Sequence, residues 1–226
     1  MSGRPAPVVK ICGLTRPRDA ELAVELGARL VGLNFWPGSP RCLEASAARE
    51  VASAVRGRAL VVGVFVDQPR ARIEELREGV GLDLVQLHGE EPAAEVAGFG
   101  DRAIKALRLD AGTPPDLGAY GDCWGFLCDA ADRQRWGGTG EAWDWARATH
   151  LPTTRRILVA GGVAPGRVAA VLAACRPYGL DVCSGVESAP GIKDREKMQR
   201  LFAEIAAVAA GAGTEEHRDG EQTYPS

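Results

Sequence analysis

The sequence lacks the features that mark membrane, secreted and nucleic-acid-binding proteins. None of its 226 residues lies in an apolar stretch that approaches the ~20 residues a membrane-spanning helix needs. There is no excess of positive charge either, because the net charge is -3 and the pI is near 5.7. This balance argues against nucleic acid or an anionic membrane as the main partner. Residues 1–7 are polar and do not resemble a secretory signal, so we expect them to form a flexible N-terminus.

Motifs for metals and nucleotide cofactors are also missing. The six cysteines show no close-paired spacing of the metal-binding or redox type, and His88, His150 and His217 lie in unrelated contexts. No GK[ST] or GxGxxG motif follows an apolar run, so neither a P-loop nor a dinucleotide fingerprint is indicated. We therefore expect no metal and no cofactor. Most of the cysteines lie in or beside apolar runs, which favours a cytoplasmic protein with reduced thiols and no disulfides.

Short apolar runs, by contrast, recur along the whole chain. Most are continuous rather than alternating, which is typical of strands covered on both faces, as in a parallel sheet. The predicted strands are Val8–Cys12, Leu30–Phe35, Ala59–Val66, Leu82–Leu87, Ala103–Leu107, Trp124–Cys128, Arg156–Ala160 and Leu180–Cys183.

Amphipathic segments rich in alanine and arginine separate these runs. Helices are predicted over Arg18–Leu26, Ala45–Val55, Arg70–Arg77, Arg167–Cys175 and Asp194–Ala210. Strand followed by helix, repeated eight times, predicts an α/β fold of the (β/α)8 type, with a single barrel domain over residues 8–210. The helices are weakest around Pro115–Tyr120 and Arg135–Gly140, so a doubly wound open sheet remains the structural alternative. Residues 211–226 are polar and are expected to form a disordered tail.

The ends of the last two predicted strands suggest a phosphate site. In a (β/α)8 barrel the active site lies at the C-terminal ends of the strands. Gly161-Gly162 and Ser184-Gly185 follow the seventh and eighth runs, where exposed backbone N–H groups of such barrels commonly bind phosphate. The alternative is that these glycines only form tight turns, but two such turns on neighbouring strands favour phosphate binding.

Other strand ends carry reactive side chains. Strand alternation places Lys10 and Cys12 on the same inward face, where the ammonium group would favour the thiolate; a buried packing cysteine is the alternative. Asp129 leaves the sixth run and is either a cap or a proton donor. Arg41 lies in a turn and is either solvated or a ligand for a carboxylate. The glycine-rich Gly137–Gly140 suggests a loop near the ligand.

Taken in order, these segments resemble the phosphoribosylanthranilate isomerases, a family of tryptophan biosynthesis. Each segment alone is only suggestive, but the ordered set is highly specific and covers nearly the whole chain. The segments are Lys10–Thr15 (KICGLT), Gly38–Arg41 (GSPR), Val62–Val66 (VGVFV), Val85–Glu90 (VQLHGE), Ile104–Lys105, Gly137–Gly140 (GGTG) with Trp143–Trp145, Ala160–Gly162, and Asp181–Glu187 (DVCSGVE) with Pro190–Asp194.

The resemblance implies a cofactor-free Amadori rearrangement of a small phosphorylated aldosylamine by a monomer or homodimer. The substrate would be N-(5-phosphoribosyl)anthranilate and the product 1-(2-carboxyphenylamino)-1-deoxyribulose 5-phosphate. By the same resemblance Cys12 would be the general base, Asp129 the general acid and Arg41 the contact for the anthranilate carboxylate. Phosphate binding would fall to Gly161, Gly162, Ser184 and Gly185, with Asp181 in a supporting role.

The chain departs from the family pattern in places. Serine is usual at Cys183, an aliphatic residue at Asn34 and tyrosine at Trp36, which bears on substrate selectivity more than on reaction type. One rival is the aldosylamine isomerase of histidine biosynthesis, which typically uses aspartates at strands one and five. Another is a catalytically inert barrel that acts as a binding protein. Cys12 and Asp129 distinguish the chain from both.

Overall fold

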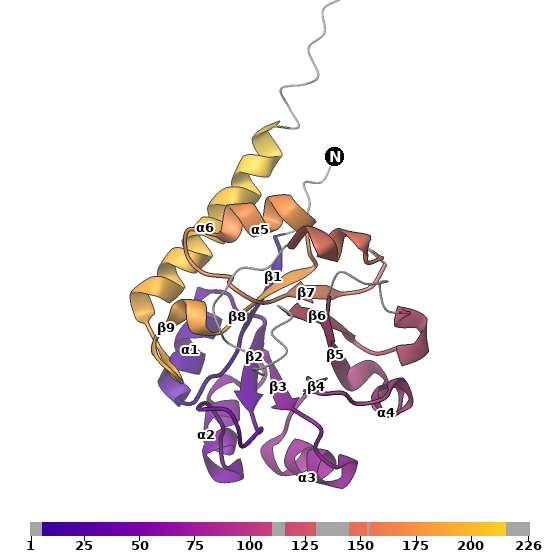
Figure 1. Ribbon diagram of the computed structural model, residues 1–226. Helices are drawn as coiled ribbons and strands as arrows, with labels where there is room; N and C mark the ends of the chain where they lie inside the picture. The colour runs from indigo at the N-terminus through magenta and orange to yellow at the C-terminus, as the bar shows by residue number, and fades with distance from the viewer. Residues whose placement is uncertain (1–5, 110–115, 130–144, 153, 216–226) are drawn as a thin grey trace, which may run out of the picture.

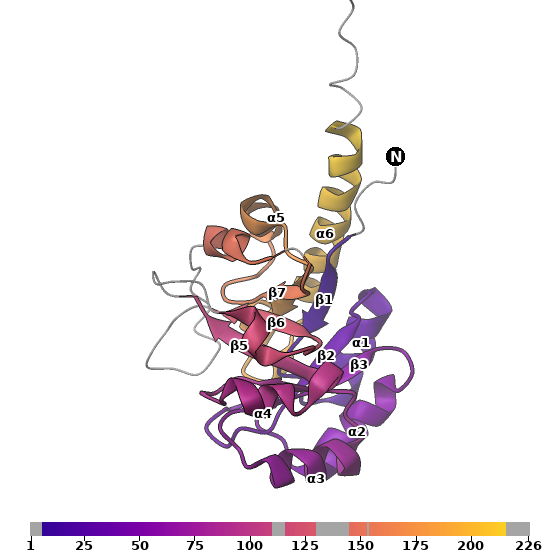
Figure 2. The same cartoon turned by 90° about the vertical axis from the view of Figure 1, so that its right-hand side faces the viewer.

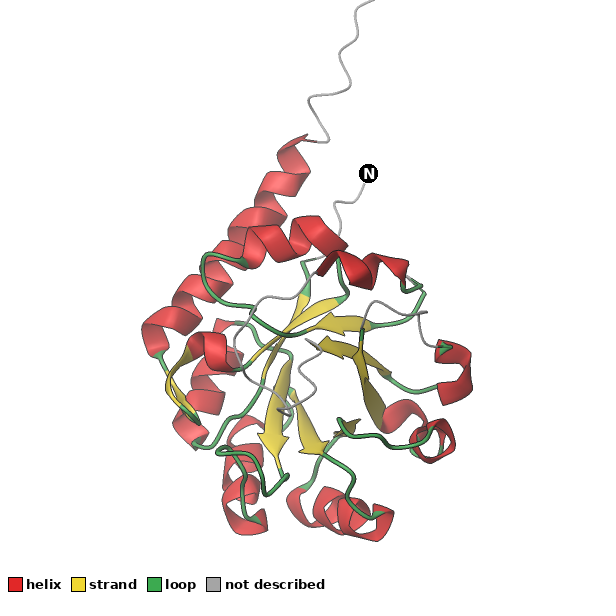
Figure 3. Ribbon diagram, viewed as in Figure 1, coloured by secondary structure: helices red, strands yellow, loops and turns green. Residues whose placement is uncertain are grey.

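The computed structural model describes residues 6–109, 116–129, 145–152 and 154–215. Eight parallel strands form a closed barrel in the order β1 to β8, surrounded by helices (Figures 1 and 3). This confirms the predicted (β/α)8 fold and excludes the open sheet. The strands are β1 Val8–Ile11, β2 Leu30–Asn34, β3 Leu60–Phe65, β4 Leu84–Leu87, β5 Ala103–Arg108, β6 Gly125–Asp129, β7 Ile157–Val159 and β8 Gly179–Val182.

The helices alternate with these strands along the chain. They are α1 Pro17–Leu26, α2 Ala45–Val55, α3 Arg70–Val80, α4 Ala93–Ala97, α5 Val168–Cys175 and α6 Arg195–Glu215, with short 3-10 segments η1 Gly100–Arg102, η2 Leu117–Tyr120, η3 Trp145–His150 and η4 Ser184–Val186. A small hairpin of β9 Glu187–Ala189 and β10 Ile192–Lys193 follows η4. Figure 2 shows the same arrangement after a turn of 90°, with the C-terminal part of α6 extending past the barrel.

Most predicted boundaries agree with the structure to within a few residues. Around Pro115–Tyr120 the sequence predicts only a weak helix, and the described residues of this segment form the short 3-10 helix η2. The last helix extends past its predicted end at Ala210 to Glu215, so residues 211–215, predicted as part of a disordered tail, are helical. Adding residues to a helix that has already formed is far less costly than starting one. None of the described helices combines the length and the apolar character that a membrane span requires.

The barrel closes where β1 pairs with β8. Their register joins Val8 to Gly179 at one end and Ile11 to Val182 at the other. This pairing places the first and last strands side by side, so residues that follow β1 and β8 lie next to each other on one rim. The rim at the C-terminal ends of the strands is the face where such barrels carry their active sites.

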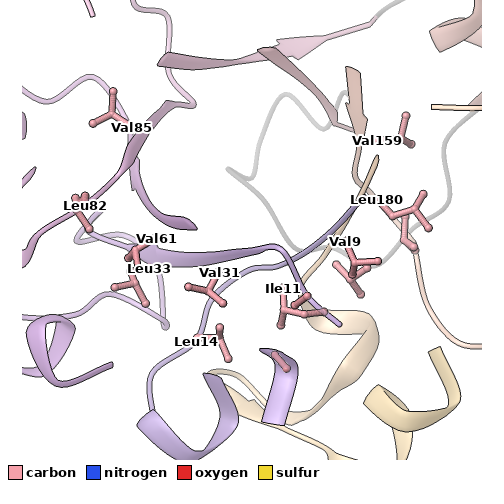
Figure 4. Close-up of a cluster of buried hydrophobic side chains, with 14 of the residues drawn as sticks. Val9, Ile11, Leu14, Val31, Leu33, Val61, Leu82, Val85, Val159 and Leu180 are labelled. Atoms are coloured by element: carbon pink, nitrogen blue, oxygen red, sulfur yellow. The ribbon is translucent and has the colours of Figure 1, made fainter. Parts of the chain in front are cut away.

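Two apolar layers hold the barrel together. The inner one fills the lower barrel with aliphatic side chains from alternate strand positions: Leu30, Val62, Leu84, Ile104, Ala106, Leu127, Leu158 and Ala160. The other positions point outward and pack beneath the helices, as Figure 4 shows for Val9, Ile11, Val31 and Leu33. Each fully buried side chain of this size contributes about 1.5–3 kcal/mol. Because both faces are apolar, the strands read as continuous hydrophobic runs in the sequence.

Candidate active site

A buried ion pair lies inside the barrel, below the rim, between β1 and β8. Lys10 and Asp181 are register partners, and Lys10 Nζ lies 2.8 Å from Asp181 Oδ1. Burial raises the pKa of Asp181 to about 6 against the opposing effect of Lys10. Burial alone would lower the pKa of Lys10, but Asp181 and Cys12 raise it above its ordinary value. Both partners are therefore charged at neutral pH.

Cys12 follows β1 directly above this pair. Its backbone N–H donates to the Val182 carbonyl at 2.9 Å, which fixes the residue at the end of the strand. Gly32 on β2 leaves the space that the thiol occupies. A Cβ atom on Gly32 would lie 2.8 Å from Cys12 Sγ and 3.2 Å from Lys10 Nζ. The predicted neighbourhood of Lys10 and Cys12 on the inward face is thus confirmed.

The surroundings of Cys12 favour its thiolate. Interaction with the neighbouring Cys183 thiol lowers the pKa of Cys12, burial opposes this, and the positive charges of Lys10 and Lys193 lower the pKa further. The net result lies well below the ordinary value for a thiol. The thiolate is the basic and nucleophilic form of cysteine, so this environment favours the form of Cys12 that can accept a proton.

Asp129 ends β6 on another part of the rim and lies near a histidine. His88 Nε2, which follows β4, is 3.4 Å from Asp129 Oδ2. Gln86 Nε2 lies 2.8 Å from His88 Nδ1. An amide nitrogen only donates, so in this amide orientation Nδ1 accepts and the ring proton is on Nε2, facing Asp129. Each of the His88 and Asp129 side chains is 16% exposed, so the pair borders the open rim.

Arg41 is held from one edge by an acidic residue of the β9–β10 hairpin. Its Nε donates to Glu187 Oε1 at 2.9 Å and its Nη2 to Glu187 Oε2 at 2.6 Å. Lys193 Nζ also donates to Glu187 Oε1, at 2.8 Å. Within the described part of the chain no hydrogen bond from Arg41 Nη1 is found. The guanidinium group can therefore offer its remaining N–H groups to a carboxylate ligand.

Gly13 brings Arg41 close to the end of β1. The backbone of Gly13 has φ +68°, and a Cβ atom there would lie 2.5 Å from Arg41 Cδ and 2.9 Å from Cys183 Sγ. Any side chain would therefore collide with both neighbours. The absence of one places Arg41 over the same region of the rim as Cys12.

The glycines after β7 and β8 lie in neighbouring loops. Gly161 and Gly162 have φ +75° and +71°, a left-handed conformation that glycine adopts without strain. Ser184 and Gly185 belong to η4, and a Cβ atom on Gly185 would collide with the carbonyl oxygen of Val163. The two loops therefore touch, as a shared anion site requires. The Trp145 indole donates to the Gly161 carbonyl at 3.1 Å.

The structure thus places every predicted site residue at or just below the rim. It gathers Cys12, Asp181 and Arg41 around the ends of β1 and β8, and it joins the two glycine loops beside them. The predicted loop Gly137–Gly140 lies outside the described residues. Asn34, one of the departures from the family pattern, uses its Oδ1 to accept the Trp36 N–H at 2.8 Å.

Sequence reasoning missed the residues that orient this set. Glu187 and Lys193 stand in the segments that carried the family resemblance, and Gln86 and His88 end a strand in a polar pattern, but neither observation gave them a role. The available signal was the pair Gln86 and His88, two polar residues on the same side of a strand end, which could have been expected to contact each other. Among the described residues, no group of three or more His, Cys, Asp or Glu side chains is arranged to hold a metal ion.

Comparisons with known proteins agree on one family. Residues 9–204 match the family model described as N-(5'-phosphoribosyl)anthranilate (PRA) isomerase. A relative of that name from Halorhodospira halophila is 43% identical over 199 residues, covering 87% of this chain and 95% of the relative. The crystal structure of the phosphoribosyl anthranilate isomerase from Thermus thermophilus has a TM-score of 0.81 and 43% identity, covering 89% of this chain and 99% of that one.

A second solved structure, of another phosphoribosyl anthranilate isomerase, contains a bound ligand. It is a complex with reduced 1-(o-carboxyphenylamino)-1-deoxyribulose 5-phosphate, with a TM-score of 0.74 and 29% identity, covering 89% of this chain and 99% of that chain.

Proposed function

Because the chain belongs to the phosphoribosylanthranilate isomerase family, we propose that it rearranges N-(5-phosphoribosyl)anthranilate in tryptophan biosynthesis with Asp129 as general acid and Cys12 as general base. The product is 1-(2-carboxyphenylamino)-1-deoxyribulose 5-phosphate. The observation that carries this assignment of roles is the burial of Cys12 against Cys183, Lys10 and Lys193, an environment that holds its pKa well below the ordinary value. Inert packing of a cysteine requires no such environment.

The first step opens the ribose ring. Asp129 donates a proton to the ring oxygen, and the lone pair of the anthranilate nitrogen forms the C1′–N double bond as the C1′–O bond breaks. The His88 ring faces the carboxyl group from 3.4 Å and orients it toward the sugar. General acid catalysis of this kind contributes about 10²–10⁴-fold.

The second step moves the double bond. The protonated imine acidifies the hydrogen on C2′, and the Cys12 thiolate removes it to give an enolamine. Proton return to C1′ and loss of the hydroxyl proton from C2′ then give the ketone. The substrate's own nitrogen accepts the electron pair during this step. Lys10 and Asp181 act through Cys12. Their ion pair, with Lys10 Nζ 2.8 Å from Asp181 Oδ1, holds the positive charge of Lys10 next to the Cys12 sulfur.

Binding uses the two ends of the substrate. The backbone N–H groups of Gly161, Gly162, Ser184 and Gly185 bind the phosphate, as glycine-containing loops after strands seven and eight commonly do. Arg41 binds the anthranilate carboxylate with the N–H groups that Glu187 leaves available. The product analogue bound by a relative carries both groups, a phosphate and a carboxyphenyl ring, which supports this division.

The strand ends also disfavour the rival isomerase of histidine biosynthesis. That class typically places aspartates at strands one and five, whereas here β1 leads into Cys12 and β5 ends at Arg108. All six cysteines are free, which suits a reducing compartment. We therefore place the enzyme in the cytoplasm, with the barrel over residues 8–210 as its catalytic domain.

The test is an assay of the purified protein with freshly generated phosphoribosylanthranilate, followed by the loss of substrate fluorescence. We expect turnover by the wild type and a fall of at least about 100-fold in kcat for both Cys12→Ala and Asp129→Asn, because each removes one proton transfer. Affinity for the reduced product analogue should survive in both variants, as neither side chain anchors the phosphate.

Cys175→Ala is the matched control. This cysteine lies in α5, where its thiol contacts the Val171 carbonyl, so the variant should turn over as the wild type does. Wild-type turnover by Cys12→Ala would remove Cys12 from the role of base. No fluorescence change with the wild type would overturn the assigned reaction.

A further inference from the structure

A second thiol lies beside the proposed base and has no part in the steps above. Cys183 follows β8 as Cys12 follows β1, and the register of the two strands ends at the pair Ile11 and Val182. Cys12 and Cys183 are therefore the next residues across the strand pair. Neighbouring strands lie about 4.8 Å apart, within the Cα separation of roughly 4.4–6.8 Å that disulfides span.

The two side chains point into the same space. Lys10 and Asp181, one alternation earlier on the same strands, meet inside the barrel at 2.8 Å, so Cys12 and Cys183 also face inward. The two thiols shift each other's pKa, and the Cys183 thiol donates to Glu187 Oε1 at 4.0 Å. Gly13 and Gly32 lack the side chains that would occupy the space around Cys183 Sγ and Cys12 Sγ. The backbone thus permits the sulfurs to approach.

We propose that Cys12 and Cys183 are an oxidation site for peroxides, at which a reversible disulfide switches the enzyme off and protects its base. The Cys12 thiolate attacks one oxygen of hydrogen peroxide, the O–O bond breaks, and sulfenic acid and hydroxide form. The Cys183 sulfur then attacks the sulfenic sulfur and releases water after its proton is transferred to the leaving hydroxyl group. Both thiols are oxidised by two electrons in total, and the peroxide is reduced to two water molecules.

The environments of the two sulfurs suit these two roles. The interaction with Cys12 raises the pKa of Cys183 well above its ordinary value, and burial raises it further. Lys10 Nζ and Cys12 Sγ border the same space beside Gly32, whereas the Cys183 thiol donates to the Glu187 carboxylate. Cys12 is therefore the thiolate that meets the peroxide, and Cys183 is the thiol that resolves the sulfenic acid. A resolving thiol at this distance competes with further oxidation to sulfinic acid, which is not reversed by ordinary reductants.

The switch follows from the proposed role of Cys12, because a sulfur in a disulfide has no basic lone pair to take a proton from C2′. The formation of the bond, however, does not depend on that role. It is therefore measured directly, by mass spectrometry, as well as through turnover.

The experiment treats the purified wild type with hydrogen peroxide, blocks free thiols and digests it with trypsin and a protease that cleaves before aspartate. This digestion separates Cys183 from Cys175 by cutting before Asp181. We expect a cross-linked species that joins residues 11–18 to residues 181–193 and disappears with dithiothreitol. Turnover should fall at least about 10-fold and return with the reductant, each sample being compared with its own untreated activity.

Two variants make the outcome decisive. In Cys183→Ser the same treatment should give no cross-link, sulfinic acid on Cys12 and a loss of turnover that dithiothreitol does not restore. Cys175→Ala should behave as the wild type. A wild type that carries sulfinic acid on Cys12 without the cross-link would overturn the proposal. A cross-link that forms without any loss of turnover would instead contradict Cys12 as the base, while the oxidation site would stand.

Discussion

At the scale of single residues, the site depends on side chains that are absent as much as on those present. Gly32 illustrates this, because its hydrogen leaves room for the sulfur of Cys12 and the amine of Lys10. A methyl group there would also lie 3.1 Å from the Cα atom of Cys12. The glycine therefore sets the distance between the thiolate and its neighbouring positive charge.

Gly32→Ala should accordingly separate Lys10 from Cys12 and weaken the support for the thiolate. We expect kcat/KM to fall at least about 10-fold near neutral pH. Because the charge of Lys10 lowers the pKa of Cys12, its displacement raises that pKa. The acidic limb of the pH–rate profile should therefore move to higher pH, as measured by the fluorescence assay across the pH range.

Gly79→Ala is the control for this variant. Gly79 lies in α3, and the nearest heavy atom to a new Cβ there is Arg49 Nη2 at 3.9 Å. Its pH–rate profile should coincide with that of the wild type. An unshifted acidic limb in Gly32→Ala would mean that the sulfur does not depend on its distance from Lys10.

At the scale of elements, one carboxylate ties the loops after β3 and β4 to strand β5. Glu91 accepts hydrogen bonds from Lys105 Nζ on β5, from the Asp67 N–H after β3 and from the Gly89 N–H after β4. Only 2% of its side chain and 5% of that of Lys105 is exposed. This buried contact holds the turn that carries His88 next to Asp129.

Glu91→Gln should therefore lower stability in a pH-dependent way. Breaking a buried ion pair costs about 3–5 kcal/mol, and urea unfolding at pH 7 should show a loss of this size. Burial raises the pKa of Glu91, but Lys105 and the backbone donors outweigh it and leave the pKa below its ordinary value. The contribution is present above the unfolded pKa of about 4.3 and is lost as the pH falls through the lower folded value.

The gap in unfolding free energy between wild type and Glu91→Gln should consequently narrow in acid. Glu75→Gln is the matched control, because Glu75 pairs with Arg72 on the surface with 68% of its side chain exposed. Pairs of this kind contribute about 0–1 kcal/mol. A gap for Glu91→Gln that stays constant down to pH 3 would show that the ion pair does not set it.

The same elements show how far the sequence could predict the structure. Local periodicity was enough for the barrel, the strand runs and the shared face of Lys10 and Cys12, since each rests on residues close together in the chain. The partners of these residues could not be predicted from the residues alone. Asp181 meets Lys10 only through the register of the first and last strands, and Glu187 meets Arg41 across most of the sequence. Such contacts depend on barrel closure, which no local pattern encodes.

At the scale of the whole molecule, catalysis and stability are located in different parts of the fold. The polar side chains lie at the rim, whereas the apolar layers lie below it and beneath the helices. The last helix belongs to the second group: α6 packs on α1 and α5, and its residues Met198 and Leu201 are fully buried. A defect in α6 should therefore change stability without changing the chemistry.

Leu201→Ala should lower the free energy of unfolding by about 2–5 kcal/mol, because the fully buried side chain leaves a cavity that its neighbours fill only in part. The kcat of the folded protein should remain that of the wild type, since α6 meets the rim through its first turn, where Lys197 Nζ donates to the Glu187 carbonyl, and Leu201 lies beyond that turn. Asp129→Asn should do the opposite, with an unchanged urea midpoint and a collapsed rate. Gln199→Ala, at an exposed position of the same helix, should change neither quantity. If Leu201→Ala lowered kcat as strongly as Asp129→Asn under conditions where it is fully folded, α6 would be coupled to the site, and the rim could not be treated as an independent catalytic layer on a stable base.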